Sequence, residues 1–190
     1  NLHVIFKEFE SIIVAHNLPY TIINVTVDLF QKLYSEMEKK NFGIKRCNIR
    51  NSLKAACLFY ACKQCNIPRE KKDIADIMGY NTNIVTKGCN FFLDIMGNEF
   101  VQMEPFNTAD FTSRFCNQLN INFQNEKIIT EIVSFVTTKI KCLNDTAPTN
   151  IVSACIYFSN SELHFIGILH TKITKKQIHI ICGTSQIIVS

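Results

Sequence analysis

The stretch that decides the fold occurs twice, as AACLFYA at residues 55–61 and as SACIYFS at residues 153–159. Each run combines small residues with an apolar stripe that carries aromatic rings. Each run is followed by a short apolar helix pattern that ends in glycine, first at 73–79 and then at 177–183. Internal repetition of this kind is the sequence signature of repeat architectures. The sequence therefore predicts an all-α fold in which one helical unit is used twice.

Five helices are predicted for the first repeat. Apolar residues from Ile23 to Met37 step by four, three, four and three, which is the spacing of a helix with one buried face. Pro19 suits the opening of that helix, and Gly43 ends it. The alanines of the 55–61 run favour a central helix, because small residues let neighbouring helices approach closely. The five predicted ranges are about 2–16, 19–42, 48–65, 71–78 and 82–96.

The second repeat is predicted to follow the same order. Its helices are expected at about 111–119, through the periodic stretch Ile129–Leu143, from Pro148 onward and at 175–182, with a fifth helix cut short at Ser190. Thr149 or Asn150 is the expected cap of the central helix. Residues 160–174 are expected to form a longer connection with strand-like or irregular structure. The predicted domains are residues 1–98 and 110–190, joined by a linker at 99–109.

Composition sets limits on the class of protein. A hydrophobic share of 47% with 19% charged residues is typical of a packed globular chain. Nine cysteines, an odd number scattered through apolar helices, indicate reduced thiols and not a disulfide framework. No apolar stretch is long enough to span a bilayer, and no secretory leader is expected. The net charge of +4 permits an acidic partner without requiring one.

Two stretches resemble the general transcription factor IIB family. The first is AACLFYACKQ at 55–64 followed by Ile67-Pro68-Arg69, and the second is FTSRFC at 111–116 with Leu119. The similarity covers both repeats and the linker. It implies a monomeric two-lobed clamp that binds TATA-binding protein on bent promoter DNA and helps to recruit RNA polymerase. It also implies that no cofactor is held by this chain, because the family's zinc ribbon precedes the repeats and is not in this sequence.

The divergence and AT-rich coding bias fit a eukaryotic large DNA virus that encodes its own initiation factor, and equally a divergent protist. The expected location is the nucleus, or the cytoplasm and virion for a cytoplasmic virus. No membrane association is expected.

Basic residues of the first repeat are the first candidate site. The resemblance implies that Arg69 and Lys72 face the acidic surface of TATA-binding protein. The family also carries a basic residue at the position of Lys63. Contacts to DNA are assigned to Lys87 and to the loop residues Lys45, Arg46 and Arg50. The alternative for each is a solvated charged face, which is what most charge runs are.

The second repeat supplies the remaining DNA contacts. A helix pair of the helix-turn-helix type can place its second helix in the major groove, although the same pair also occurs in this fold for packing alone. The resemblance implies that the fifth helix of the second repeat contacts the DNA bases. The family's base-contacting arginine would fall at Ser190 of this chain. The second repeat's predicted DNA-binding residues are Lys175, Lys176, Thr184, Ser185, Gln186 and Ser190, and the last four are expected to be exposed.

Enzyme signatures are missing, so the chain is predicted not to be an enzyme: it has no glycine-rich phosphate loop and no nucleophile elbow. Cys62 and Cys65 have the spacing of half a zinc site, but no second pair follows, which favours structural thiols. The alternative function is a cyclin-type regulatory subunit that binds a protein kinase. Such a subunit needs a lysine and a glutamate on its third and fifth helices, and this chain offers Lys54 and only Asp94.

Overall fold

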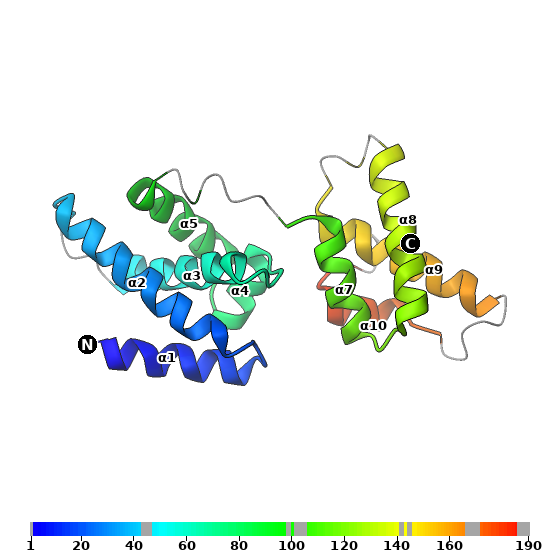
Figure 1. Cartoon of the computed structure of the whole chain (residues 1–190), viewed down its shortest axis with the longest axis horizontal. Coiled ribbons are helices and arrows are strands. Elements are labelled where there is room, and N and C mark those ends of the chain that lie inside the picture. Colours follow the sequence, from blue (N-terminus) through cyan, green and yellow to red (C-terminus); the bar gives the residue numbers. More distant parts are fainter. Residues whose placement is uncertain are drawn as a thin grey trace. The chain divides into compact units, whose positions relative to one another are not determined.

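A computed structural model of the 190-residue chain describes residues 2–42, 47–97, 100, 106–140, 143, 146–165 and 172–185. Over these ranges the chain contains nine α-helices and no strand, which confirms the all-α prediction (Figure 1). The chain divides into two compact units, Asn1–Glu104 and Pro105–Ser190. Each unit has its own cluster of buried apolar residues. None of the described helices combines the length and apolar character needed to cross a membrane.

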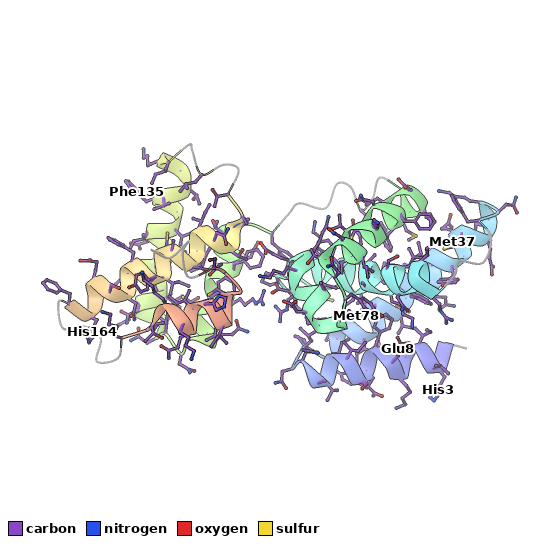
Figure 2. The ribbon with its side chains drawn as sticks, turned by 180° about the vertical axis from the view of Figure 1, so that it is seen from behind. His3, Glu8, Met37, Met78, Phe135 and His164 are labelled. Atoms are coloured by element: carbon purple, nitrogen blue, oxygen red, sulfur yellow. The ribbon has the colours of Figure 1, made fainter. Side chains whose placement is uncertain are left out.

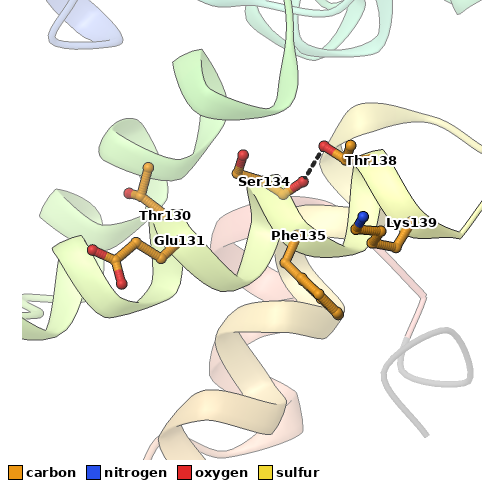
Figure 3. A pocket seen from close by; sticks show the side chains of 6 residues that line it. All are labelled: Thr130, Glu131, Ser134, Phe135, Thr138 and Lys139. Carbon is orange, nitrogen blue, oxygen red and sulfur yellow. Dashed lines mark hydrogen bonds between the residues drawn. The ribbon is translucent and has the colours of Figure 1, made fainter.

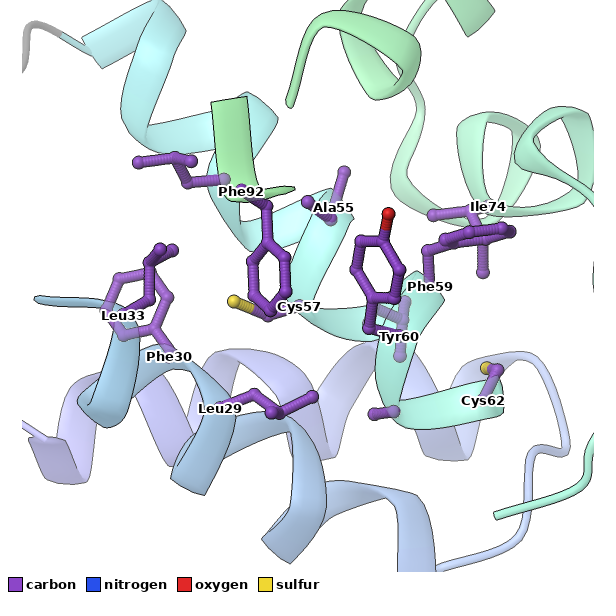
Figure 4. Packing of buried hydrophobic residues seen from close by; sticks show 14 of the residues in the cluster. Leu29, Phe30, Leu33, Ala55, Cys57, Phe59, Tyr60, Cys62, Ile74 and Phe92 are labelled. Atoms are coloured by element: carbon purple, nitrogen blue, oxygen red, sulfur yellow. The ribbon is translucent and has the colours of Figure 1, made fainter. Parts of the chain in front are cut away.

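Unit 1 contains the five helices that the sequence predicts. They are α1 (Leu2–Ala15), α2 (Thr21–Lys39), α3 (Cys47–Gln64), α4 (Lys71–Met78) and α5 (Thr82–Met96). The central helix is α3, which packs against α2, α4 and α5. Its alanines at 55, 56 and 61 are completely buried, as the sequence predicts. Large side chains of the other helices, such as Phe30 and Phe92, pack around it (Figure 4).

Helices α3 and α5 approach each other closely at Gly88 of α5. A Cβ atom added there would lie 2.0 Å from the carbonyl oxygen of Ser52 and 2.5 Å from its carbonyl carbon. Both of these are backbone atoms of α3, so neither can rotate away. Glycine is therefore required at this position by the packing of α5 on α3 and not by backbone conformation.

Local signals explain why the ends of α4 and α5 are predictable. Gly79 ends α4 in the left-handed region, with a φ of 67°, which glycine adopts without steric cost. Asn81 precedes α5, and its side-chain Oδ1 accepts a hydrogen bond from the Asn83 amide at 2.9 Å. In unit 2, Gly183 ends α10 with the same φ of 67°. The repeat therefore extends to the backbone conformation of these turns.

Phe100 belongs to the core of unit 1, although the sequence places it in the linker. Its ring lies edge-on to Phe92 at 4.9 Å and to Tyr60 at 5.6 Å between centroids, and the side chain is only 7% exposed. Tyr60 and Phe92 stack on each other at 4.5 Å. The assignment of Phe100 to the linker is thus wrong, because its ring packs in the core of unit 1 with those of Tyr60 and Phe92.

Unit 2 contains α7 (Thr108–Gln118), α8 (Phe123–Lys139), α9 (Pro148–Phe165) and α10 (Lys175–Cys182). Two predictions fail at α9. Thr149 and Asn150 are not caps but first-turn residues, since the Ala147 carbonyl accepts from the Asn150 amide at 3.0 Å. The connection also does not begin at residue 160, because α9 continues to Phe165.

The end of this connection is tied to α9 by Asn160. Its side chain is 2% exposed, and its Oδ1 accepts a hydrogen bond from the Ile173 amide at 2.7 Å. Ile173 itself is buried in the core of unit 2. The buried amide therefore satisfies a backbone donor that would otherwise be unpaired beside an apolar core.

One ring of α9 is far more exposed than its counterpart in unit 1. The repeat aligns Phe158 with Tyr60, yet Phe158 is 58% exposed and Tyr60 is 4% exposed. Tyr60 is covered by Phe92 of α5. The residues that correspond to α5 in the second repeat come after Ser185 and lie outside the described residues.

Candidate functional site

The strongest candidate site is a cationic surface of unit 1, formed by Lys63 at the end of α3, Arg69 ahead of α4, and Lys71 and Lys72 in the first turn of α4. Lys72 is exposed and the other three are half-buried. These elements lie together because α3 and α4 pack against each other and both pack against α5 (Figure 1).

Lys63 and Lys71 are close enough to influence each other. Burial lowers the pKa of the Lys63 ammonium, and the neighbouring Lys71 lowers it further. The Lys63 Nζ lies 5.6 Å from the centroid of the Phe59 ring, a favourable position for a cation. Burial raises the pKa of the Cys89 thiol to about 11, and both lysines oppose that rise. The two ammonium groups and this thiol therefore form one cluster across α3, α4 and α5.

Arg69 and the acidic residues beside it are held by the backbone. The Arg69 Nη1 donates a hydrogen bond to the Pro68 carbonyl at 2.7 Å. Asp73, one turn into α4, accepts a hydrogen bond from the Glu70 amide at 2.8 Å and so closes the helix start. Asp73 is thereby committed to capping α4. Glu70 and Asp73 form a capping box there, so two carboxylates lie beside the cations at the start of α4.

A lysine pair opens the fourth helix of each unit. Lys71-Lys72 opens α4, and Lys175-Lys176 opens α10. Cations in the first turn of a helix oppose the helix macrodipole, so helix stability does not favour them there. An external anion is favoured at the same position, because the unpaired backbone N–H groups of the helix start and the lysine ammonium groups both attract it. The sequence already shows Lys71 within the basic stretch of the first repeat, and the repeated pair supports its place on the cationic surface.

In unit 2 the lysine pair lies beside an aromatic ring, at a helix start that is closed by side-chain hydrogen bonds. The Lys175 Nζ lies 5.4 Å from the centroid of the Tyr157 ring, and Lys176 is exposed. Thr174 caps the helix: its Oγ1 accepts from the Gln177 amide at 3.2 Å, and Gln177 Oε1 accepts from the Thr174 amide at 2.8 Å. The capping bonds therefore fix the start of the helix, while Lys176 faces solvent and Lys175 lies near an aromatic ring.

The prediction that Thr184 is exposed is wrong. Its side chain is 3% exposed, and its carbonyl accepts a hydrogen bond from the His179 ring. Its Oγ1 has no hydrogen-bond partner among the residues that the structure describes. The repeat explains this, because Thr184 follows the α10 glycine as Tyr80 follows Gly79, and Tyr80 packs against the core of unit 1. Ser185, which is exposed, corresponds to the capping Asn81. Gln186 and Ser190 lie outside the described residues.

The other predicted DNA contacts are not gathered on the cationic surface. Lys87 is exposed on α5, but it lies two residues before buried Cys89, about 200° around the helix. Arg50 is exposed in the first turn of α3 and lines a separate groove. Lys45 and Arg46 lie outside the described residues.

The two cysteines that resemble half a zinc site lie on α3. Cys62 is completely buried, and burial raises the pKa of the Cys65 thiol. Neutral, buried thiols behave as small apolar groups. In the ranges that the structure describes, no three residues of the metal-binding types are grouped. The prediction that this chain holds no metal stays a prediction.

A shallow hollow of about 520 Å³ lies on unit 2, but its lining residues all come from α8 (Figure 3). The Phe135 ring is 63% exposed there, between Glu131 and Lys139. The Thr138 hydroxyl donates to the Ser134 carbonyl at 2.7 Å, which is a bond within the helix. Because one helix supplies every lining residue, the hollow is a helix face and not an enclosed catalytic pocket.

Lys54, the lysine that a kinase-binding role requires, is already paired within unit 1. Its side chain is 9% exposed, and its Nζ lies 2.6 Å from both carboxylate oxygens of Glu8 on α1. Glu8 is labelled in Figure 2. This pair fastens α1 to the central helix and leaves the ammonium largely buried.

The Lys54–Glu8 pair is expected to contribute measurably to stability. Glu8→Gln leaves a buried ammonium without its counter-charge, and we expect the free energy of unfolding of unit 1 to fall by about 1.5 kcal/mol, less than for a fully buried pair because Glu8 is 36% exposed. Glu10→Gln on the same helix is the matched control. Its pair with Lys7 is more exposed, so the expected loss is below about 1 kcal/mol. Equal losses in urea denaturation would contradict this account.

The fold and the surface first define the class: an all-α protein of two helical repeats with cationic surfaces. No family model matches the chain. A transcription initiation factor IIB-like protein of Acanthamoeba polyphaga mimivirus is 29% identical over 198 residues, covering 98% of this chain and 41% of that protein. Transcription initiation factor IIB of Xenopus laevis is 26% identical and that of Homo sapiens 25% identical, each over 182 residues, covering 96% of this chain and 52% of the relative.

These similarities extend over nearly the whole chain, which is therefore similar to transcription initiation factor IIB across both of its units. The chain spans about half the length of the curated relatives that it matches. The mimivirus relative agrees with the prediction of a large-virus genome, which stays a prediction.

Proposed function

We propose that this chain acts in transcription initiation as the core of a factor IIB-type protein, binding TATA-binding protein together with promoter DNA and helping to recruit RNA polymerase. Its place of action would be the nucleus, or the cytoplasm and virion for a cytoplasmic virus. The observation that carries the proposal is the cationic surface of unit 1, with the lysine pair of its α4 repeated in α10.

The modest net charge of +4 suits a joint target better than naked duplex. Affinity for duplex alone comes chiefly from phosphate contacts and falls steeply with salt. TATA-binding protein kinks DNA by inserting apolar side chains into the minor groove, and so offers a bent shape beside its own surface. A protein that requires both partners gains specificity that a few lysines would not provide. We therefore expect shape to contribute more than base contacts.

The burial of Thr184 strengthens that expectation. The Thr184 side chain is 3% exposed, so it cannot reach a base edge in this conformation. The DNA contacts of unit 2 would then come from Lys175 and Lys176, which reach phosphates and carry no sequence information. Swapping base pairs that flank the TATA element should leave the affinity unchanged.

Charge reversal at Arg69 tests the partner surface. Arg69→Glu is expected to weaken the complex with TATA-binding protein and TATA duplex at least ~10-fold, because a repulsive charge would meet an acidic partner. Lys32→Glu, an exposed position on α2, makes the same change in net charge and should alter affinity less than ~2-fold. Gel shifts at fixed salt give both numbers, and circular dichroism confirms that each variant is folded. Equal effects of the two variants would contradict a role for the cationic surface.

A further inference from the structure

A groove of about 490 Å³ in unit 1 is not used by the proposed function. It is lined by Ile5 of α1, by one stripe of α2 and by Arg50 of α3. Its floor is apolar: Ile5 is 3% exposed, Phe30 is 7% exposed, and the Tyr34 ring lies 4.6 Å from that of Phe30. An apolar floor with a few polar groups at its edge is typical of sites that bind a ligand.

Two opposite charges line this groove. Arg50 and Glu38 are both exposed, and among the described residues neither takes part in an ion pair. Burial raises the pKa of Tyr34 and the Arg50 guanidinium opposes that rise, so the cation lies near the phenol. Glu38 follows Tyr34 by one helical turn of α2. The groove therefore offers a ligand one cation, one anion and an apolar surface.

The second repeat does not reproduce this chemistry. Its helix α8, which follows the first helix of unit 2 as α2 follows α1, contains no tyrosine. The repeat of the central helix puts Pro148 at the position of Arg50. The helix packing that the units share consequently requires neither the phenol nor the guanidinium. Their presence in unit 1 alone points to binding.

We propose that this groove docks a segment of a partner protein that presents one apolar side chain between an acidic and a basic residue. The apolar side chain covers Phe30 and Tyr34, the carboxylate meets Arg50, and the cation meets Glu38. Duplex DNA fits less well, because its phosphates repel Glu38 and it has no protruding apolar side chain to cover the floor. A purely acidic segment meets the same repulsion at Glu38.

Peptide display on the folded 190-residue chain tests the proposal without DNA or TATA-binding protein, so its result does not depend on the proposed function. The wild-type chain is expected to enrich peptides with an apolar residue flanked by one acidic and one basic residue. Arg50→Glu should replace the acidic position of that consensus by a basic one, and Glu38→Lys should replace the basic position by an acidic one. Lys87→Glu, outside the groove, should leave the consensus unchanged.

Binding of one selected peptide by fluorescence anisotropy completes the test. Its affinity is expected to fall at least ~10-fold with Arg50→Glu and to return with the charge-swapped peptide. Absence of any enriched consensus, enrichment of purely acidic peptides, or an unchanged consensus on Arg50→Glu would each overturn the proposal. So would a loss of TATA-duplex binding on Arg50→Glu with peptide affinity intact, because Arg50 would then serve DNA.

Discussion

Replacing Gly88 with alanine is expected to lower the free energy of unfolding of unit 1 by about 3 kcal/mol. The new Cβ would lie 2.0 Å from the Ser52 carbonyl oxygen, so α5 must move off α3, the helix with which it shares most of the core. Alanine gains about 1 kcal/mol in helix propensity, which is too little to offset that separation. For a unit of about 100 residues the loss corresponds to a fall in Tm of roughly 12 °C or more.

Tyrosine fluorescence measures this loss in unit 1 with little contribution from unit 2. The chain has no tryptophan, and of its five tyrosines only Tyr157 lies in unit 2. Two units need not unfold together, so a probe specific to one of them is required. Asn90→Ala, at an exposed position of the same helix, should change stability by less than about 0.5 kcal/mol. An unchanged Tm for Gly88→Ala would show that α3 and α5 are not in such close contact.

Phe100→Ala is expected to destabilise unit 1 by about 3 kcal/mol. The substitution removes a ring that is 7% exposed and lies against both Phe92 and Tyr60, so it loses apolar burial and opens a cavity. The same substitution in a true linker would have almost no effect. The tyrosine signal is again suitable, because Tyr60 itself borders the cavity.

Phe123→Ala provides the control for Phe100→Ala. The Phe123 side chain is 80% exposed at the start of α8, and its removal should change stability by less than about 0.5 kcal/mol. If Phe100→Ala were as harmless as Phe123→Ala, the aromatic cluster of unit 1 would not include Phe100.

Where apolar spacing and end signals coincide in the sequence, the helices are predicted to the residue. The bounds of α4 and α5 are the clearest case, since Gly79, Asn81 and Gly97 mark three of their ends with glycines of positive φ or a side-chain cap. The central helices are predictable for a different reason. Their small residues are expected where several helices pack closely together, and both copies of the repeat contain them.

Features that depend on single residues are not predictable in this way. Phe100 lies with Val101 and Met103 in a short stretch between Gly97 and Pro105, which is too short for periodicity to show that its ring is buried. Thr184 is polar and follows a helix end, which suggests exposure, yet the packing of the turn buries it. Sequence spacing also grouped Arg50 with Lys45 and Arg46, whereas the turn of α3 directs it to the groove beside Tyr34.

The basic residues also divide into what the sequence predicts and what only the packing of the helices decides. Lys63 and Lys71 are eight residues apart and on different helices, and only the packing of α3 on α4 brings them to one cluster. Lys87 looks equivalent in sequence, but its position on α5 turns it to another side of that helix. Charge composition therefore predicted that a cationic surface exists, and the helix packing decided which residues form it.

The most direct test of the central claim is a gel shift with TATA duplex in the presence and absence of TATA-binding protein, at fixed salt. We expect the chain alone to bind duplex weakly and with a shallow salt dependence, and to bind the complex of duplex with TATA-binding protein at least ~100-fold more tightly. Equal affinity for duplex with and without TATA-binding protein would contradict the claim that the two repeats recognise a joint protein–DNA surface.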